Sequence, residues 1–164
     1  MEWDAHISKK LRIDNGRGWL KKIAAFFAHS GDSWFWVLGL LIIYIFFPPL
    51  RQTALRYISS ILSLAVLVLA IKFLVRRQRP QGEWGAIYRR TDPHSFPSGH
   101  AARATLLAVL GLGWGPPLWG GSLLVWAPLV CVARVALGLH YFSDILAGAV
   151  LGGLAGVLSL WWFG

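Results

Sequence analysis

Long apolar runs are the feature that most constrains this sequence. The stretch from Ser33 to Leu50 carries no charged residue and is long enough to cross a bilayer with little tilt before it ends at Pro48 and Pro49. Hydrophobic residues make up 56% of the chain and charged residues only 14%, which leaves too few polar side chains to cover a water-soluble globule of this size. Lipid is therefore the expected solvent, and the sequence predicts an all-α polytopic membrane bundle.

About five transmembrane helices are expected after an amphipathic N-terminus. Their predicted ranges are 33–50, 57–75, 98–112 (apolar from Ala104 onward), 122–137 and 141–163. Arg51 and Arg56 are expected in a short turn between the first two, and Gly120 and Gly121 at the start of the fourth. We interpret 1–164 as one membrane-embedded domain, with an amphipathic segment at 1–33 and a transmembrane core at 34–164.

The N-terminal segment contains two short helical patterns, at 4–13 and 19–28, separated by a break at Asn15 and Gly16. In the second pattern Lys21 and Lys22 lie opposite a Leu, Ile and Phe face, which is typical of a helix lying in the membrane interface. A packed amphipathic helix without lipid contact is the alternative. The charges throughout this segment argue against a cleavable signal peptide.

A stripe of small residues marks the last predicted helix. Gly148, Gly152 and Gly156 are spaced four apart, which favours close helix packing, either within the bundle or between two copies of the chain.

Alternation of the spans gathers the polar residues. With five spans, the N-terminal segment, the loop at 76–97, the helix start at Ser98 and the turn at 138–140 fall on one face of the membrane. At that helix start, Ser98 is a favoured N-cap and the free N–H groups form a typical place for an anion. His100 adds a titratable group there, although a capped helix beside a polar loop is the simpler alternative.

Further charged residues lie at the ends of the neighbouring runs. Snorkelling explains single cations near the end of the second span, Lys72 and Arg79 among them. Arg134 is harder to explain in this way, because it lies in an otherwise uncharged segment and such a charge usually has a partner. His140 and Asp144 are four apart on one helix face, where the carboxylate can orient the imidazole. A structural His–Asp pair is the alternative, but beside cations the pair suggests a phosphate site with a nucleophile.

Three sequence blocks resemble the signature of one enzyme family. They are Lys72-x6-Arg79-Pro80, Pro97-Ser98-Gly99-His100 and Arg134-x5-His140-x3-Asp144. In this order, each at the end of an apolar run, they resemble the signature blocks of the type 2 phosphatidic acid phosphatases (PAP2), which are integral membrane lipid phosphatases. Two departures stand out. The family usually has Ser where this chain has Ala133, and its common six-span plan lacks its first span here.

The resemblance implies a role for each matched residue. His140 would attack phosphorus and form a phosphohistidine, Asp144 would orient His140, and His100 would act as general acid and then general base. The implied phosphate ligands are Lys72, Arg79, Ser98, the Gly99 N–H and Arg134. Arg103 could reach a second phosphate of a diphosphate or simply snorkel.

No metal ion or other cofactor is expected. Asp144 is committed to His140, and Glu83 and Asp92 are isolated in the sequence, so no carboxylate cluster of metal-ligand character is present. The formal net charge of +9 favours an anionic lipid substrate and a membrane surface over nucleic acid in a chain this apolar.

The expected function is hydrolysis of the terminal phosphate from a membrane lipid phosphate or diphosphate. A polyprenyl (undecaprenyl-type) diphosphate or phosphate and a phosphatidylglycerol-phosphate-like lipid are the favoured substrates. A lipid phosphotransferase would share every motif and differ in its product. A lipid-phosphate binding or transport protein is the non-enzyme alternative, although a binder needs no paired nucleophile and acid.

Charge asymmetry predicts the orientation in the cell membrane. Fourteen of the 16 Lys and Arg residues fall on the active face, and only Arg51 and Arg56 on the other. The positive-inside rule then favours a cytoplasmic active site in the inner membrane, against the outer-face habit of the six-span members. A positive rim that gathers substrate on either side is the alternative reason for the same asymmetry.

Overall fold

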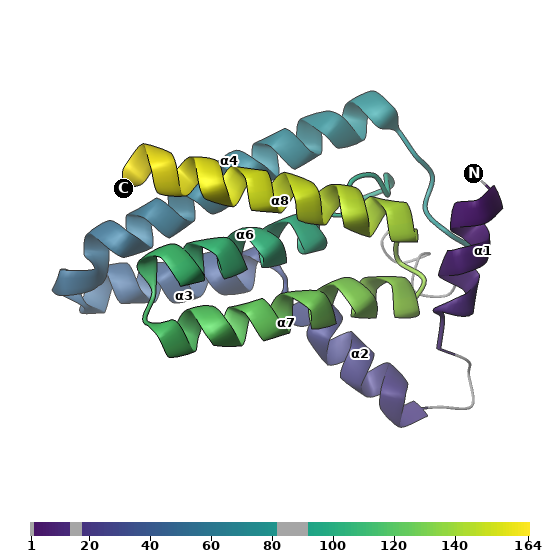
Figure 1. Ribbon diagram of the computed structural model, residues 1–164, viewed down its shortest axis with the longest axis horizontal. Coiled ribbons are helices and arrows are strands. Elements are labelled where there is room, and N and C mark those ends of the chain that lie inside the picture. Colours follow the sequence, from purple (N-terminus) through teal and green to yellow (C-terminus); the bar gives the residue numbers. More distant parts are fainter. Residues whose placement is uncertain (1, 14–17, 82–91) are drawn as a thin grey trace.

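The computed structural model describes residues 2–13, 18–81 and 92–164, and these residues form a helical bundle. The elements are α1 (Glu2–Lys10), α2 (Gly18–Ser30), α3 (Ser33–Phe46), the 3-10 turn η1 (Pro48–Leu50), α4 (Arg51–Val75), α6 (Gly99–Trp114), α7 (Pro117–Ala136) and α8 (Phe142–Phe163). Figure 1 shows α6 running between α7 and α8, with α3 and α4 on its far side. An isolated β-bridge joins Gln78 to His94.

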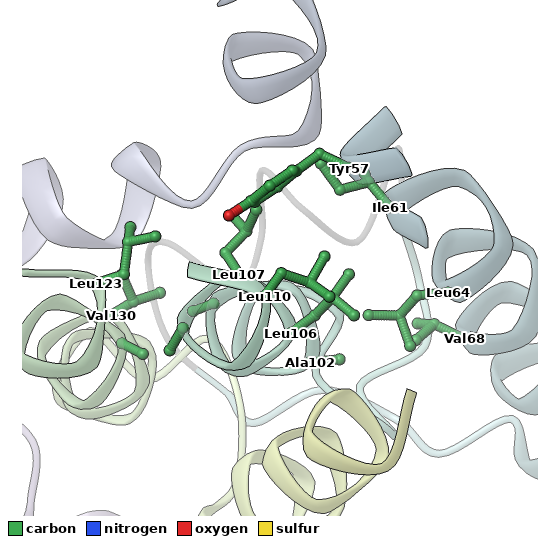
Figure 2. Packing of buried hydrophobic residues seen from close by; sticks show 13 residues of the cluster. Tyr57, Ile61, Leu64, Val68, Ala102, Leu106, Leu107, Leu110, Leu123 and Val130 are labelled. Atoms are coloured by element: carbon green, nitrogen blue, oxygen red, sulfur yellow. The ribbon is translucent and has the colours of Figure 1, made fainter. Parts of the chain in front are cut away.

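Helix α6 forms the centre of the core. Leu106, Leu107 and Leu110 have 0% exposed surface, and they pack between Ile61 of α4 and Val130 of α7 (Figure 2). The outward faces of the other helices are also apolar, with side chains such as those of Val66, Leu118 and Val150 exposed by 70%, 85% and 62%. A surface of this kind is suited to lipid.

All five predicted hydrophobic segments are helical, which confirms the all-α membrane fold class. Among the described residues, α4, α7 and α8 are each long and apolar enough to cross a membrane, and α2 with α3 forms a further candidate span bent by 54°. Helix α6 has 16 residues and is shorter than these spans. Its place in the middle of the bundle means that other helices, rather than lipid, surround most of it.

Two predicted helix boundaries are wrong. Helix α4 begins at Arg51, not at residue 57, because η1 leads directly into it and Arg51 Nε donates to the Tyr44 carbonyl at 3.0 Å at the end of α3. Helix α7 begins at Pro117, a residue suited to a first helical turn. Gly120 therefore lies inside α7, where an added Cβ would come within 2.7 Å of the Gly111 carbonyl oxygen.

The N-terminal helices both pack onto the bundle. Helix α1 overlaps the predicted range 4–13, but both its start and its end come a few residues earlier. Helix α2 matches its prediction closely. Ala24 and Ala28 of α2 are buried against the end of α7, and Trp19 and Phe26 are exposed by 66% and 68%. The predicted break at 15–16 lies outside the described residues. An interfacial position of α2 stays a prediction.

The glycine stripe of α8 is used inside the bundle. A Cβ added at Gly148 would lie 2.4 Å from the Ser98 carbonyl oxygen, and one at Gly152 would lie 1.9 Å from the Ala102 carbonyl oxygen. These distances are far below van der Waals contact, so the backbones of α6 and α8 meet only because the side chains are missing.

We predict that Gly152→Ala weakens the α6–α8 contact. The methyl group must push two backbones apart, which we expect to destabilise the protein by about 1–3 kcal/mol. Thermal unfolding in detergent measures this loss. Gly153→Ala is the matched control, because its Cβ would meet only Thr105 Cγ2, at an ordinary 3.7 Å. Equal melting temperatures for the two variants would contradict the proposed contact.

Candidate active site

The starts of α6 and α8 are joined directly. The backbone N–H of Ser98 donates to the Asp144 carbonyl at 3.0 Å, and the Ser98 hydroxyl accepts from the Ala101 N–H at 3.4 Å. The prediction that Ser98 caps this helix is confirmed, and its hydroxyl is already used in doing so. In Figure 1 these helix starts lie at the same end of the bundle as the ends of α4 and α7, which confirms the predicted convergence.

His140 lies in the turn between α7 and α8, with 1% of its surface exposed. Its Nδ1 is 2.8 Å from the Ser95 carbonyl oxygen, so Nδ1 carries the proton and donates it. Nε2 then carries the lone pair of the ring and accepts from Arg79 Nη1 at 3.2 Å and from Arg134 Nη2 at 3.5 Å. Burial, followed by the charges of Arg134, Arg79 and Lys72, lowers the pKa of His140 well below its ordinary value. The imidazole is therefore neutral at neutral pH, with a basic nitrogen facing two guanidinium groups.

Asp144 is fully buried in the first turn of α8. Its Oδ2 accepts from the Tyr141 N–H at 2.9 Å and lies 3.6 Å from His140 Nδ1. Its Oδ1 accepts from Arg77 Nη1 at 2.7 Å. The carboxylate predicted to orient His140 thus lies beside it, but the hydrogen bond that Nδ1 donates goes to the Ser95 carbonyl. Neither Ser95 nor Arg77 was predicted in the site.

Side chains of helix α1 accept hydrogen bonds from the first turn of α8. Asp4 Oδ1 accepts from the Ser143 N–H at 3.0 Å, and Ser8 Oγ accepts from the Phe142 N–H at 2.9 Å. Two otherwise free N–H groups of α8 are thereby satisfied. Arg77 Nη2 donates to Asp4 Oδ2 at 2.6 Å. Burial raises the pKa of Asp4, but hydrogen bonds from Ser143 and Arg77 outweigh burial and hold the pKa below its usual range. The carboxylate is therefore ionised at neutral pH.

A cavity of about 170 Å³ opens beside His140. Its polar wall includes Lys72, Gly99, His100 and Arg103, whereas its apolar wall comes from one face of α4. That face consists of Ile61, Leu64, Ala65, Val68 and Leu69. The structure therefore gathers both predicted catalytic histidines with four of the predicted phosphate ligands, namely Lys72, Arg79, Gly99 and Arg134.

Asp92 lies between two of those ligands. Its Oδ2 accepts from Arg79 Nη2 at 2.8 Å and forms an ion pair with Lys72 Nζ. Asp92 was expected to belong to no cluster of carboxylates, and the partners that the structure gives it are cations 20 and 13 residues away in the sequence. Glu83 lies outside the described residues. Two cations that share one carboxylate oxygen can bind a phosphoryl oxygen in the same geometry.

His100 and Arg103 both contact the break between α2 and α3. His100 Nε2 is 2.7 Å from Asp32 Oδ1, and Arg103 donates to the Gly31 carbonyl. Arg103 is buried, with 9% of its surface exposed, and does not snorkel to the membrane surface. It lines the cavity beside His100, as its alternative role requires.

A family model described as the PAP2 superfamily matches residues 53–164, more than half of the chain. The chain belongs to the PAP2 superfamily. The match contains all three sequence blocks and every cavity-lining residue named above. Asp4 and Asp32 lie before it.

Individual relatives are also similar to this PAP2 chain. It is 34% identical over 134 residues to the decaprenylphosphoryl-5-phosphoribose phosphatase of Mycobacterium tuberculosis, covering 80% of this chain and 73% of that one. It is 29% identical over 147 residues to an undecaprenyl-diphosphatase of Sulfolobus acidocaldarius, covering 86% and 69%. Its structure is similar to the crystal structure of a transmembrane PAP2 type phosphatidylglycerolphosphate phosphatase from Bacillus subtilis, with a TM-score of 0.81, 26% identity, and coverage of 98% of this chain and 84% of that one. The predicted family, fold class and enzyme class, a membrane phosphatase, are thereby confirmed.

Ala133, where the family usually has Ser, lies in the contact between α2 and α7. Ala133 is 4% exposed and clusters with Ala24 and Ala28 of α2. Its side chain therefore packs on α2.

We predict that Asp92→Asn strengthens anion binding. The change removes the carboxylate charge that competes for Lys72 and Arg79, and we expect vanadate to bind about tenfold more tightly, or about 1.4 kcal/mol. Calorimetric titration in detergent measures the affinity. His94→Gln is the control, because residue 94 contacts Lys72 through its backbone carbonyl only. An affinity unchanged or reduced by Asp92→Asn would contradict the competition.

Proposed function

We propose that this PAP2 protein hydrolyses the terminal phosphate of a membrane lipid phosphate or diphosphate through a phosphohistidine on His140. One observation carries the proposal. The proton of His140 is held on Nδ1 by the Ser95 carbonyl, and the lone pair on Nε2 faces Arg79 and Arg134. A buried neutral imidazole that faces two cations is arranged to attack the phosphorus atom of an anion.

In the first step, Nε2 of His140 attacks phosphorus and the bond from phosphorus to the leaving oxygen breaks. His100 gives its proton to that oxygen. The phosphoryl oxygens would bind to Lys72, Arg79, Arg134 and the Gly99 N–H at the start of α6. Asp144 would stabilise the positive charge that His140 gains when the N–P bond forms.

In the second step, His100 accepts a proton from water while the water oxygen attacks phosphorus. The N–P bond breaks, His140 returns to its neutral form and inorganic phosphate leaves. The cations of the protein supply the charge stabilisation in both steps. A metal ion is not needed for this chemistry, because the cavity already presents positive charge to the substrate.

The apolar face of α4 supports a lipid as the substrate. It begins at Lys72, beside the proposed phosphate position, and continues to Ile61 near the middle of α4. A phosphate bound at the polar end would leave its hydrocarbon tail along this face. Arg103, which also lines the cavity, would bind a second phosphate group. Polyprenyl diphosphates or phosphates and phosphatidylglycerol phosphate are therefore the proposed substrates, in line with the names of the relatives.

Phosphate release from a panel of lipids tests this function. We expect the detergent-solubilised protein to release inorganic phosphate from polyprenyl diphosphate or phosphatidylglycerol phosphate, and to do so in EDTA. His140→Ala should lose the activity together with the acid-labile phosphoenzyme that rapid quench traps in the parent. A phosphorylated acceptor in place of free phosphate would indicate a phosphotransferase. Binding without turnover would indicate a transport or binding protein.

We also propose that the protein lies in the inner membrane with its active site facing the cytoplasm. Helices α1 and α2, which carry basic residues, lie at the active-site end of the bundle, whereas α4, which carries Arg51 and Arg56 in its first turns, begins at the other end (Figure 1). Short segments rich in Lys and Arg stay on the cytoplasmic side. The anionic inner leaflet would attract the same residues.

Cysteine labelling in intact cells tests the orientation. In a Cys131→Ala background, single probes replace two exposed residues, His6 on α1 and Gln52 at the opposite end of the bundle. We expect an impermeant maleimide to label Gln52→Cys and to label His6→Cys only after the cells are opened. The reverse pattern would show that the site faces outward.

A further inference from the structure

Asp32 lies in the short break between α2 and α3, where the two helices meet at a bend of 54°. It is the N-cap residue of α3, but its side chain makes no capping hydrogen bond. An N-cap aspartate normally uses its carboxylate to accept from the first N–H groups of its own helix. Here that carboxylate points to α6 instead, where Oδ1 lies 2.7 Å from His100 Nε2.

Neighbouring residues of α2, α6 and α7 hold the contact between Asp32 and His100 in place. Arg103, one turn beyond His100, donates to the carbonyl of Gly31, so two consecutive residues of the break are bound to α6. Gly31 has little spare room, since an added Cβ would lie 3.2 Å from Val130 Cγ1 and 3.3 Å from His100 Cδ2. The second oxygen of Asp32 lies 3.5 Å from His29 Nδ1. The carboxylate is thus fixed beside the imidazole, although it comes from a segment before the family match.

The position of the proton on His100 follows from this contact. A carboxylate only accepts hydrogen bonds, so Nε2 of His100 carries a hydrogen in both protonation states of the ring. Nδ1 is then the nitrogen that gains and loses a proton. Burial disfavours the imidazolium form, and the positive charges of Arg134 and Arg103 oppose a further positive charge on the ring. The negative charge of Asp32 offsets part of that repulsion.

We infer that Asp32 is a positioning residue for His100. It holds Nε2–H, directs Nδ1 toward the reacting oxygen and stabilises the imidazolium form of His100 before the leaving oxygen is protonated. This inference rests on the proposed function. In the first step Nδ1–H passes its proton to the leaving oxygen, and in the second step Nδ1 takes one from water. Asp32 stays ionised and Nε2 keeps its hydrogen throughout. A carboxylate that holds the tautomer of a catalytic histidine is an arrangement that hydrolases use elsewhere.

The test compares two substrates that differ in their need for a general acid. An alkyl phosphate and an aryl phosphate with the same hydrocarbon tail are given to the full-length protein in detergent, and rapid quench measures the rate of phosphoenzyme formation. An alkoxide is a poor leaving group and needs the proton of His100, whereas a phenolate leaves without it. In Asp32→Asn we expect the alkyl rate to fall by about 10²-fold and the aryl rate to change by less than about threefold.

The variant and its control are matched to this question. Asparagine has the shape of aspartate, and since the Asp32 side chain makes no capping hydrogen bond, the substitution removes none from the start of α3. His29→Gln removes the other neighbour of Asp32 and should leave both rates unchanged. The ratio of the alkyl rate to the aryl rate does not depend on the fraction of folded protein, so a loss of stability cannot imitate the effect.

Two outcomes would overturn the inference: equal slowing of both substrates in Asp32→Asn, or no slowing of either. A selective loss with the alkyl substrate, absent from His29→Gln, would support it. Failure of the proposed function would show differently, because the parent protein would then form no phosphoenzyme from either substrate.

Discussion

The backbones of α6 and α8 approach so closely at Gly148 and Gly152 that carbonyl groups of α6 occupy the space of missing side chains. This contact brings the start of one helix against the start of the other, where the Ser98 N–H donates to the Asp144 carbonyl. Histidines that are 40 residues apart in the sequence therefore line one cavity. Side chains larger than glycine on α8 would separate the two helix starts, and with them the proposed acid and nucleophile.

Charge balance is the second condition for this site. Buried cations are tolerated only when they have partners, and the described residues supply short acidic side chains from segments that lie far apart. Asp4 from α1 shares Arg77 with Asp144, Asp92 contacts Lys72 and Arg79, and Asp32 contacts His100. Each pairing also fixes the position of a group near the cavity. A substrate phosphate would replace Asp92 as the partner of Lys72 and Arg79. These two cations would then keep a negatively charged partner throughout.

The N-terminal helices extend the PAP2 fold in a way that has consequences for the site. Helix α1 satisfies N–H groups at the start of α8, directly after His140, and the break between α2 and α3 contacts α6 at His100. Both segments lie before the family match at residue 53. Their aromatic side chains, including Trp3 and Trp19, are exposed on the outside of the bundle. The same two segments thus combine exposed aromatic side chains with contacts to the start of α8 and to His100.

The sequence by itself determined the helical class, the family and the residues of the three blocks. Apolar runs of membrane length must form helices in lipid. Because successive helices run in opposite directions, the helix ends that carry the candidate site residues meet at one end of the bundle. Only the tertiary structure decided which groups hold those residues in position. The Ser95 carbonyl, Asp32, Asp92 and Asp4 act through contacts with residues far away in the sequence, and no periodicity in the sequence reveals such a partner. The glycine stripe shows the same division, because its spacing predicts a close contact while only the folded backbone shows that the contact is with α6.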